Sequence, residues 1–244
     1  MNFTRTKIIT SIGPKTRDIQ SIKALHKAGM NVVRINMSHA SHKELSETVM
    51  LVKKINKDQH TKFGPIGILV DTQGPEIRTG ESDEKLDLKV GDIINLTVRD
   101  NADVETSSIK INYSGMISSV KKGSKITIDN GLINFIVLSK NRHSLKCRVV
   151  DGGKLGSKRH VNLPGVRVDL PSITKKDKKD INFALKEGVD FIALSFVRSE
   201  SDVKELRKIL DKKNSSVKII SKIENQEGLD NIHEITKASD LVMV

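Results

Sequence analysis

Charged side chains and neutral oxygen-bearing side chains stand near the ends of several apolar stretches, at spacings that place them on one side. Arg34, Asn36 and Ser38 alternate along one such stretch, and a strand projects alternate residues to the same face. Asp71 and Thr72 directly follow another. Arginine binds phosphate well, whereas carboxylates and neutral oxygens bind hard metal ions. This combination predicts a site for a phosphorylated ligand and a metal ion.

A second pair lies farther along the chain, where Lys222 and Glu224 occur within the sequence Ile-Ile-Ser-Lys-Ile-Glu. A lysine on a buried strand is costly unless a carboxylate or an anionic ligand pairs with it. We therefore interpret both residues as functional. Ser195 and Arg198 end the preceding strand pattern, so residues from four strands are expected to converge at one edge.

Several of these residues also have ordinary structural explanations. Arg34 taken alone is more often a surface or structural cation, and a lone aspartate at a strand end often caps the next helix. His39 and His42 flank a helix start and are expected to be supporting or surface residues. The sequence has no cysteine and histidine cluster with zinc spacing, no Gly-x-x-x-x-Gly-Lys-Ser/Thr loop and no nucleophile elbow.

The elements that must position these residues alternate between strand and helix patterns. The first three strands are expected at Lys7–Ile12, Asn31–Met37 and Ile66–Val70. Thr16 is expected to cap the first helix, which Gly29 ends, and Ser41 with Glu44 forms a capping box at the start of the second. Strands separated by helices imply parallel pairing with right-handed crossovers.

The pattern changes between Glu76 and about Gly165 to short runs of alternating polarity, divided by Gly, Asp and Asn. Asp129-Asn130-Gly131 between two such runs is a strong hairpin signal. We predict a small all-β barrel domain at 76–165, inserted as a lid into a domain made of 1–75 and 166–244. The Gly-Pro and Pro-Gly pairs at the two junctions are expected hinges.

After the insertion the alternation resumes, with helices expected to start at Thr174 and Ser199. The remaining strands are expected at Val189–Phe196, Val217–Ile223 and Leu241–Val244. Six strands at this spacing favour an incomplete (β/α)8 TIM barrel, because only about 155 residues lie outside the insertion. An open parallel sheet with helices on both faces fits the same count.

Composition narrows the classes of function. The chain carries a formal net charge of +12, but with six Phe, one Tyr and no Trp it lacks aromatics for base stacking, so a nucleic-acid role is not expected. Lysines such as Lys175, Lys176, Lys178 and Lys179 are expected on a solvated helix surface.

The single cysteine, Cys147, excludes an intramolecular disulfide and is expected to be a packed thiol in a strand. The segment Met1–Lys7 lacks an apolar signal region, and no run approaches the roughly 18 apolar residues of a membrane span. A cytoplasmic protein is therefore expected.

Five stretches together resemble the pyruvate kinase family. They are Thr6–Pro14, Met30–His39, Asp71–Gly80, Gly156–Gly165 and Ile219–Asn225. The resemblance runs from near residue 5 to the last residue, in the family's order, with a lid domain inserted after the third strand. It implies phosphoryl transfer from phosphoenolpyruvate to ADP, giving pyruvate and ATP in glycolysis, with Mg²⁺ or Mn²⁺ and K⁺ as cofactors. It also implies a homotetramer for the full-length form, with no nucleic-acid or membrane partner.

The resemblance implies a role for each matching residue. Lys222 looks like the cation that stabilises the transferring phosphoryl group and the enolate, and Glu224 looks like a ligand of the divalent metal. Arg34 and Arg78 would hold phosphates, and Arg159 would reach the nucleotide from the lid. The implied K⁺ ligands are Asn36, Ser38, Asp71 and Thr72.

Some positions depart from the family pattern. Family members that do without K⁺ resemble one another in carrying a lysine where this chain has Glu76, and Thr72 is kept here, so the resemblance implies K⁺ dependence. Gln73, Asn130 and Arg159 differ from the residues common in the family, and these differences bear on the nucleotide contacts that the resemblance implies.

The sequence ends before an Ala-Arg-Gly-Asp motif that in the family supplies a second carboxylate to the metal. We therefore expect the 244-residue chain alone to be inactive or nearly so, and its exposed strand edges to favour aggregation. Two alternatives stay open: another Mg²⁺-dependent barrel enzyme that handles phosphoenolpyruvate or pyruvate, and a non-catalytic product such as a truncated chain or a basic binding module.

Overall fold

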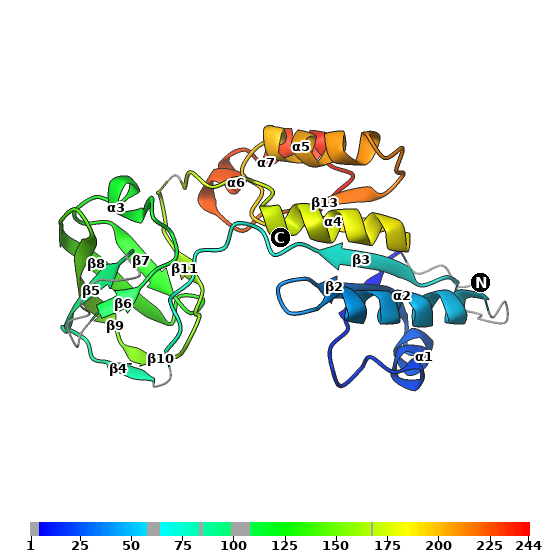
Figure 1. The fold of residues 1–244 in the computed structure, drawn as a ribbon, viewed down its shortest axis with the longest axis horizontal. Helices are drawn as coiled ribbons and strands as arrows, with labels where there is room; N and C mark the ends of the chain where they lie inside the picture. The colour runs from blue at the N-terminus through cyan, green and yellow to red at the C-terminus, as the bar shows by residue number, and fades with distance from the viewer. Residues whose placement is uncertain (1–4, 58–63, 83–84, 99–107, 167) are drawn as a thin grey trace. The chain divides into compact units, whose positions relative to one another are not determined.

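A computed structural model of the protein describes residues 5–57, 64–82, 85–98, 108–166 and 168–244 (Figure 1). Residues 1–4, part of the segment in which no signal region was found, lie outside these ranges. The chain divides into two compact units: the first comprises 1–75 and 171–244, and the second comprises 76–170. Each unit is described by itself.

Six strands in the described part of the first unit form one parallel sheet. They are β1 (Ile8–Ser11), β2 (Met30–Asn36), β3 (Gly67–Asp71), β12 (Phe191–Leu194), β13 (Lys218–Lys222) and β14 (Leu241–Met243). Their order in the sheet is β1-β2-β3-β12-β13-β14, which is also their order in the chain. A doubly wound sheet reverses its strand order at a switch point, whereas a barrel does not. The parallel half-barrel predicted from the sequence is therefore confirmed, and the open doubly wound sheet is excluded.

The described helices of the first unit, apart from the five-residue helix Gln226–Asp230, pack their apolar sides into one core. Their bounds are α1 (Ile19–Lys27), α2 (His42–Lys57), α4 (Lys175–Glu187), α5 (Glu200–Asp211), α6 (Gln226–Asp230) and α7 (Ile232–Ala238). The apolar stripe of α2, which runs from Leu45 to Ile55, is buried. The chain turns at Asn231 between α6 and α7, and Leu229 on α6 is 52% exposed.

The predicted capping box of α2 is present. The Ser41 backbone N–H donates to Glu44 Oε2 at 2.7 Å, and the Glu44 N–H donates to Ser41 Oγ at 3.3 Å. The prediction that Thr16 caps α1 is wrong. Asp18 is the N-cap, with its carboxylate accepting from the N–H groups of Gln20 and Ser21, whereas Thr16 Oγ1 accepts from the Gly13 N–H within the preceding turn.

The starts of α4 and α5 differ from each other. Thr174 and Asp177 form a complete capping box at α4. Ser199 occupies the N-cap position of α5, as predicted, but makes no capping bond, and its hydroxyl instead contacts the Ser201 hydroxyl at 2.7 Å.

The second unit is a curled mixed sheet with one additional strand pair. The six-stranded sheet has the order β11 (Val161–Asn162), β7 (Lys125–Ile128), β8 (Ile133–Lys140), β9 (Ser144–Asp151), β5 (Ile93–Thr97) and β6 (Ser108–Lys110). The pair joins β4 (Leu86–Leu88) to β10 (Gly153–Leu155), and one short helix, α3, covers Met116–Ser119. The predicted hairpin connects β7 and β8, where Asp129 and Asn130 have φ of 55° and 57°, as a tight hairpin turn requires.

Cys147 lies inside the second unit and is fully buried, as the alternating pattern of β9 predicted. Burial raises the pKa of its thiol to about 12. The side chain is therefore a packed thiol and not a thiolate nucleophile at neutral pH. Among the described helices, none has the length and apolar character needed to cross a membrane.

The α2 capping box predicts a specific pH dependence of stability. The Ser41 N–H, followed by Arg17 and the Ser41 hydroxyl, lowers the pKa of Glu44 from 4.5 to about 2. A carboxyl group whose pKa is lower in the folded state stabilises that state above its unfolded pKa and stops doing so as the pH falls through the folded pKa. We expect Glu44→Gln to lower the free energy of unfolding at about pH 6. This difference from the wild type is expected to disappear as the pH falls from 4.5 to about 2, the range between the unfolded and folded pKa values of Glu44.

Urea unfolding followed by circular dichroism across this pH range measures the difference. Glu47→Gln is the matched control on the same helix, because Glu47 faces Lys43 at 3.9 Å with an exposed side chain. A loss of unfolding free energy in Glu44→Gln that stays the same at every pH would contradict the stabilising role of the ionised Glu44 side chain.

Candidate active site

Asp71 is the centre of a polar cluster at the carboxyl ends of the strands in the first unit. Its carboxylate is fully buried. Its Oδ2 accepts from Arg34 Nε, on β2, at 2.8 Å. Lys222 Nζ, on β13, lies 3.1 Å from Oδ1 and 3.3 Å from Oδ2. The cluster therefore joins three strands that lie far apart in the sequence.

Ser195, directly after β12, adds a fourth strand to the cluster. Its Oγ donates to the Thr72 carbonyl at 2.7 Å and also lies 3.2 Å from Asp71 Oδ1. Lys222 Nζ donates to the same Oγ at 2.9 Å, and the Ser195 N–H donates to Thr72 Oγ1 at 3.1 Å. Sequence reasoning placed Ser195 at a strand end but assigned it no role, since a serine carries no charge that would mark it.

Glu224 approaches the same lysine from the loop after β13. Its Oε1 lies 3.3 Å from Lys222 Nζ, and its Oε2 accepts from the Phe196 N–H at 3.0 Å. Phe196 has a φ of 57°, which is rare for a bulky residue and is a form of backbone strain that often occurs at functional sites. Glu224 thus bridges the ends of two strands while its side chain stays 32% exposed to solvent.

The cluster balances two cations against two carboxylates. Arg34 and Lys222 face Asp71 and Glu224, and the side chains of the two cations keep 26% and 13% of their surface exposed. Cations held in this way, still partly open to solvent, suit an arriving phosphate, whose charge they meet with little rearrangement.

The oxygen donors suit hard metal ions. Among the described residues no group of three or more His, Cys, Asp or Glu side chains could hold a metal. Glu224 offers a partly exposed carboxylate that could hold Mg²⁺, an ion that commonly binds through one or two carboxylates, water and substrate phosphate. Asn36 stands opposite Asp71 across the β2–β3 pair, and its Oδ1 accepts from the Ser38 N–H at 3.0 Å. These neutral oxygens beside Asp71 and Thr72 are of the kind that binds a monovalent cation.

The remaining candidates have other partners. Arg78 and Arg159 belong to the second unit, where Arg78 Nε donates to Glu76 Oε2 at 2.7 Å and Arg159 Nη1 lies 3.6 Å from Asp129. Arg198 pairs with Asp202 on α5, with Nε 3.5 Å from the carboxylate.

Comparison with known proteins identifies the family of this fold and cluster. The family description "Pyruvate kinase, barrel domain" matches residues 3–244. The chain belongs to the pyruvate kinase family. This confirms the resemblance drawn from the sequence motifs. Similar relatives include plastidial pyruvate kinase 2 of Arabidopsis thaliana, 40% identical over 240 residues, and pyruvate kinase of Staphylococcus aureus strain MRSA252, 42% identical over 243 residues. Each alignment covers 98% of this chain, which spans about 41% of the length of either relative.

The pyruvate kinase barrel brings the cluster together through close packing at Gly74. This glycine has a φ of 71°, and a Cβ added to it would lie 2.9 Å from Ser195 Cβ and 3.0 Å from Phe196 Cδ2. The loop after β3 therefore contacts the loop after β12 at a distance that only glycine permits.

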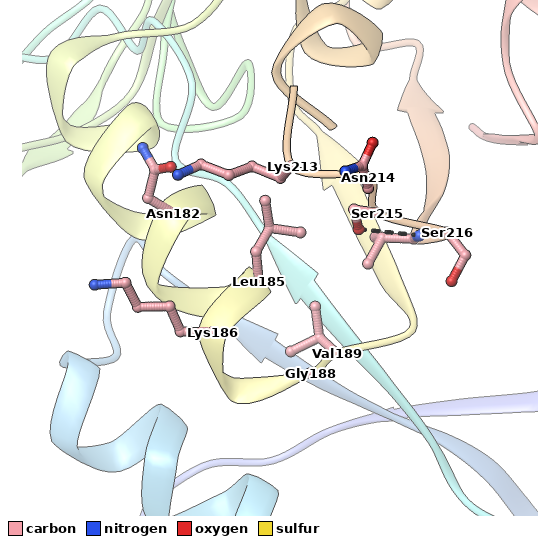
Figure 2. Close-up of a pocket in the computed structure, with 10 residues that line it drawn as sticks. Asn182, Leu185, Lys186, Gly188, Val189, Lys213, Asn214, Ser215 and Ser216 are labelled. Atoms are coloured by element: carbon pink, nitrogen blue, oxygen red, sulfur yellow. Dashed lines mark hydrogen bonds between the residues drawn. The ribbon is translucent and has the colours of Figure 1, made fainter. Parts of the chain in front are cut away.

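A cavity elsewhere in this pyruvate kinase chain lies apart from the cluster. Figure 2 shows its lining, in which Leu185 and Val189 meet the polar segment from Lys213 to Ser216, and its volume is about 520 Å³. Val189 and Val217 precede β12 and β13, so the cavity lies at the amino ends of those strands. The cluster lies at their carboxyl ends, where barrel enzymes carry their active sites.

Sequence reasoning missed the contacts made by the first turn of α4. Lys176, expected on a solvated face, donates from Nζ to the Met37 carbonyl at 2.6 Å. The buried Asp177 accepts from the Gly74 N–H at 3.1 Å. The Thr-x-x-Asp capping pattern was a signal for Asp177, but the groups that both residues contact in the two loops are backbone groups, which leave no mark in side-chain spacing.

The packing at Gly74 predicts the effect of an added methyl group. Gly74→Ala is expected to cost about 1–3 kcal/mol more in the free energy of unfolding than Gly64→Ala, because it adds overpacking to backbone strain. Gly64 is the matched control, since its φ is 76° and an added Cβ would meet nothing within 4 Å. Chemical denaturation of the two variants gives the comparison, and equal losses would show that the loops can move apart freely.

Proposed function

We propose that the protein transfers the phosphoryl group of phosphoenolpyruvate to ADP, giving pyruvate and ATP. In this reaction the bond between phosphorus and the enol oxygen breaks, a new bond forms to the terminal phosphate oxygen of ADP, and the enolate then takes a proton on carbon. The main support for the proposal is the position of Lys222. This largely buried cation contacts both Asp71 and Glu224 where the ends of four strands meet. Phosphoryl transfer requires mostly positioned positive charge of this kind.

Each residue of the cluster has a part in the proposed reaction. Lys222 is the cation placed to stabilise the transferring phosphoryl group and the negative charge that develops on the enol oxygen. Arg34, held by Asp71 and donating to Ser11 Oγ at 2.6 Å, orients the phosphate of the substrate. Asp71 and Ser195 hold Lys222 in place and are positioning residues. From the second unit, Arg78 and Arg159 are proposed contacts for phosphate and nucleotide.

The metal assignments follow from the donor chemistry. Glu224 is the proposed ligand of Mg²⁺ or Mn²⁺, and the proposed K⁺ ligands are Asn36, Ser38, Asp71 and Thr72. Bound there, the ions would add positive charge around the transferring phosphoryl group. Glu76, which accepts from Arg78 Nε, provides no ammonium that could replace K⁺, which supports K⁺ dependence.

The setting of the reaction is also part of the proposal. A homotetramer in the cytoplasm is proposed for the full-length protein by analogy with the family. One similar relative is named as plastidial.

Replacing Lys222 tests the proposed function. Lys222→Met is expected to lower the rate of pyruvate formation by about 10²–10³-fold, because it removes a positioned charge from the transition state. Lactate dehydrogenase coupling measures the rate, in the protein at its full natural length. The matched control is Lys218→Met, on the same strand, where the lysine pairs with Asp240 at 3.3 Å and its side chain is 58% exposed. Pyruvate formation that persists in Lys222→Met at the level of Lys218→Met would refute the assignment.

A further inference from the structure

The first turn of α4 contacts the two loops that carry the proposed K⁺ ligands. Lys176 Nζ donates to the carbonyl of Met37, which lies between Asn36 and Ser38. Asp177 Oδ1 accepts from the N–H of Gly74, two residues after Thr72. Adjacent residues of one helix therefore bind the main chain after β2 and after β3.

The two carboxylate oxygens of Asp177 accept hydrogen bonds from different parts of the chain. Oδ2 closes the capping box, accepting from the Thr174 N–H at 2.9 Å and from the Thr174 hydroxyl at 2.6 Å. Oδ1 is directed to Gly74. A capping box needs only one of these oxygens, so the bond to Gly74 serves something other than the start of the helix.

Lys176 is held by a second network on the same helix. Its Nζ lies 2.7 Å from Asp180 Oδ2, and the other oxygen of Asp180 lies 2.8 Å from His42 Nε2 on α2. The His42 ring stacks on Phe183 with centroids 4.3 Å apart. The ammonium that reaches Met37 is therefore fixed between two helices, although its side chain is 47% exposed.

The two loops also contact each other directly. Asn36 stands opposite Asp71 in the parallel pair, and the Met37 N–H donates to the Asp71 carbonyl at 2.9 Å. The spacing of the proposed ligands thus depends on the backbone positions of Met37 and Gly74, which α4 holds from outside the cluster.

We propose that Lys176 and Asp177 are positioning residues that set the affinity of the monovalent cation site by fixing the loops after β2 and β3. This inference rests on the proposed function, which places K⁺ among those loops. Neither residue touches the proposed ligands with its own side chain; each acts through a backbone group.

Hydrogen exchange tests the contact itself and requires no catalytic activity. In the protein at its full natural length, Asp177→Ala is expected to speed exchange in peptides covering residues 72–76, because the Gly74 N–H loses its acceptor. Thr174→Ala is the matched control: it removes the hydroxyl of the capping box but leaves the bond between Asp177 and Gly74. Equal exchange at 72–76 in Asp177→Ala and wild type would overturn the proposal.

Cation affinity is measured by the rise in melting temperature as KCl replaces tetramethylammonium chloride at constant ionic strength. Asp177→Ala and Lys176→Met are each expected to raise the half-saturating K⁺ concentration about fivefold, the effect of losing one hydrogen bond. Asp177→Asn, which keeps an oxygen for Gly74, is expected to recover part of the affinity. Thr174→Ala and Lys175→Met, the latter at an exposed neighbouring lysine, are expected to match wild type.

The outcomes separate this inference from the proposed function. An equal loss of K⁺ affinity in Thr174→Ala and Asp177→Ala, or no K⁺-specific stabilisation of the wild type, would overturn the positioning role. A wild type that binds K⁺ and shows the expected variant pattern but forms no pyruvate would support the positioning role and refute the proposed function.

Discussion

The buried carboxylate of Asp71 is the constraint on which the first unit and its site both depend. An ionised group without access to water needs charged or hydrogen-bonding partners, and Asp71 takes them from β2, from the end of β12 and from β13. Removing one partner of a buried ion pair typically costs about 3–5 kcal/mol. The carboxyl ends of these strands therefore cannot separate without a large loss of stability. The same interaction holds Arg34 and Lys222 in place, where we propose that they bind a phosphate.

Residues without a proposed role in the reaction hold the loops of this cluster in position. Gly74 allows two loops to pack at a distance that excludes a side chain, and Phe196 accepts an unusual φ while its N–H binds Glu224. Helix α4 then holds the backbone of both neighbouring loops. A phosphoryl-transfer site needs charges at fixed positions, and packing of this kind limits how far those charges can move.

Local signals in the sequence were sufficient for much of this structure. Apolar runs predicted the six parallel strands, Ser41 and Glu44 predicted the start of α2, and Asp129-Asn130-Gly131 predicted a hairpin. Strand-end spacing was enough to expect Asp71 and Lys222 at the same edge. The prediction of Thr16 as the cap of α1 was wrong because Asp18, two residues later, is also of a type that favours the N-cap position. Spacing could not choose between a barrel and an open sheet, since strand order is a property of long-range pairing. The loop contacts of Lys176 and Asp177 could not be predicted, because the groups they bind at Met37 and Gly74 are main-chain groups distant in sequence.

The proposed function requires this cluster to bind the phosphate of phosphoenolpyruvate. A crystal structure of the protein at its full natural length, grown with phosphoenolpyruvate, Mn²⁺ and K⁺, tests it most directly, since anomalous scattering locates the Mn²⁺. We expect phosphate oxygens within hydrogen-bonding distance of Lys222 Nζ and the Arg34 guanidinium, with Mn²⁺ on Glu224. A ligand bound elsewhere, with Lys222 still engaged only by Asp71, Ser195 and Glu224, would contradict it.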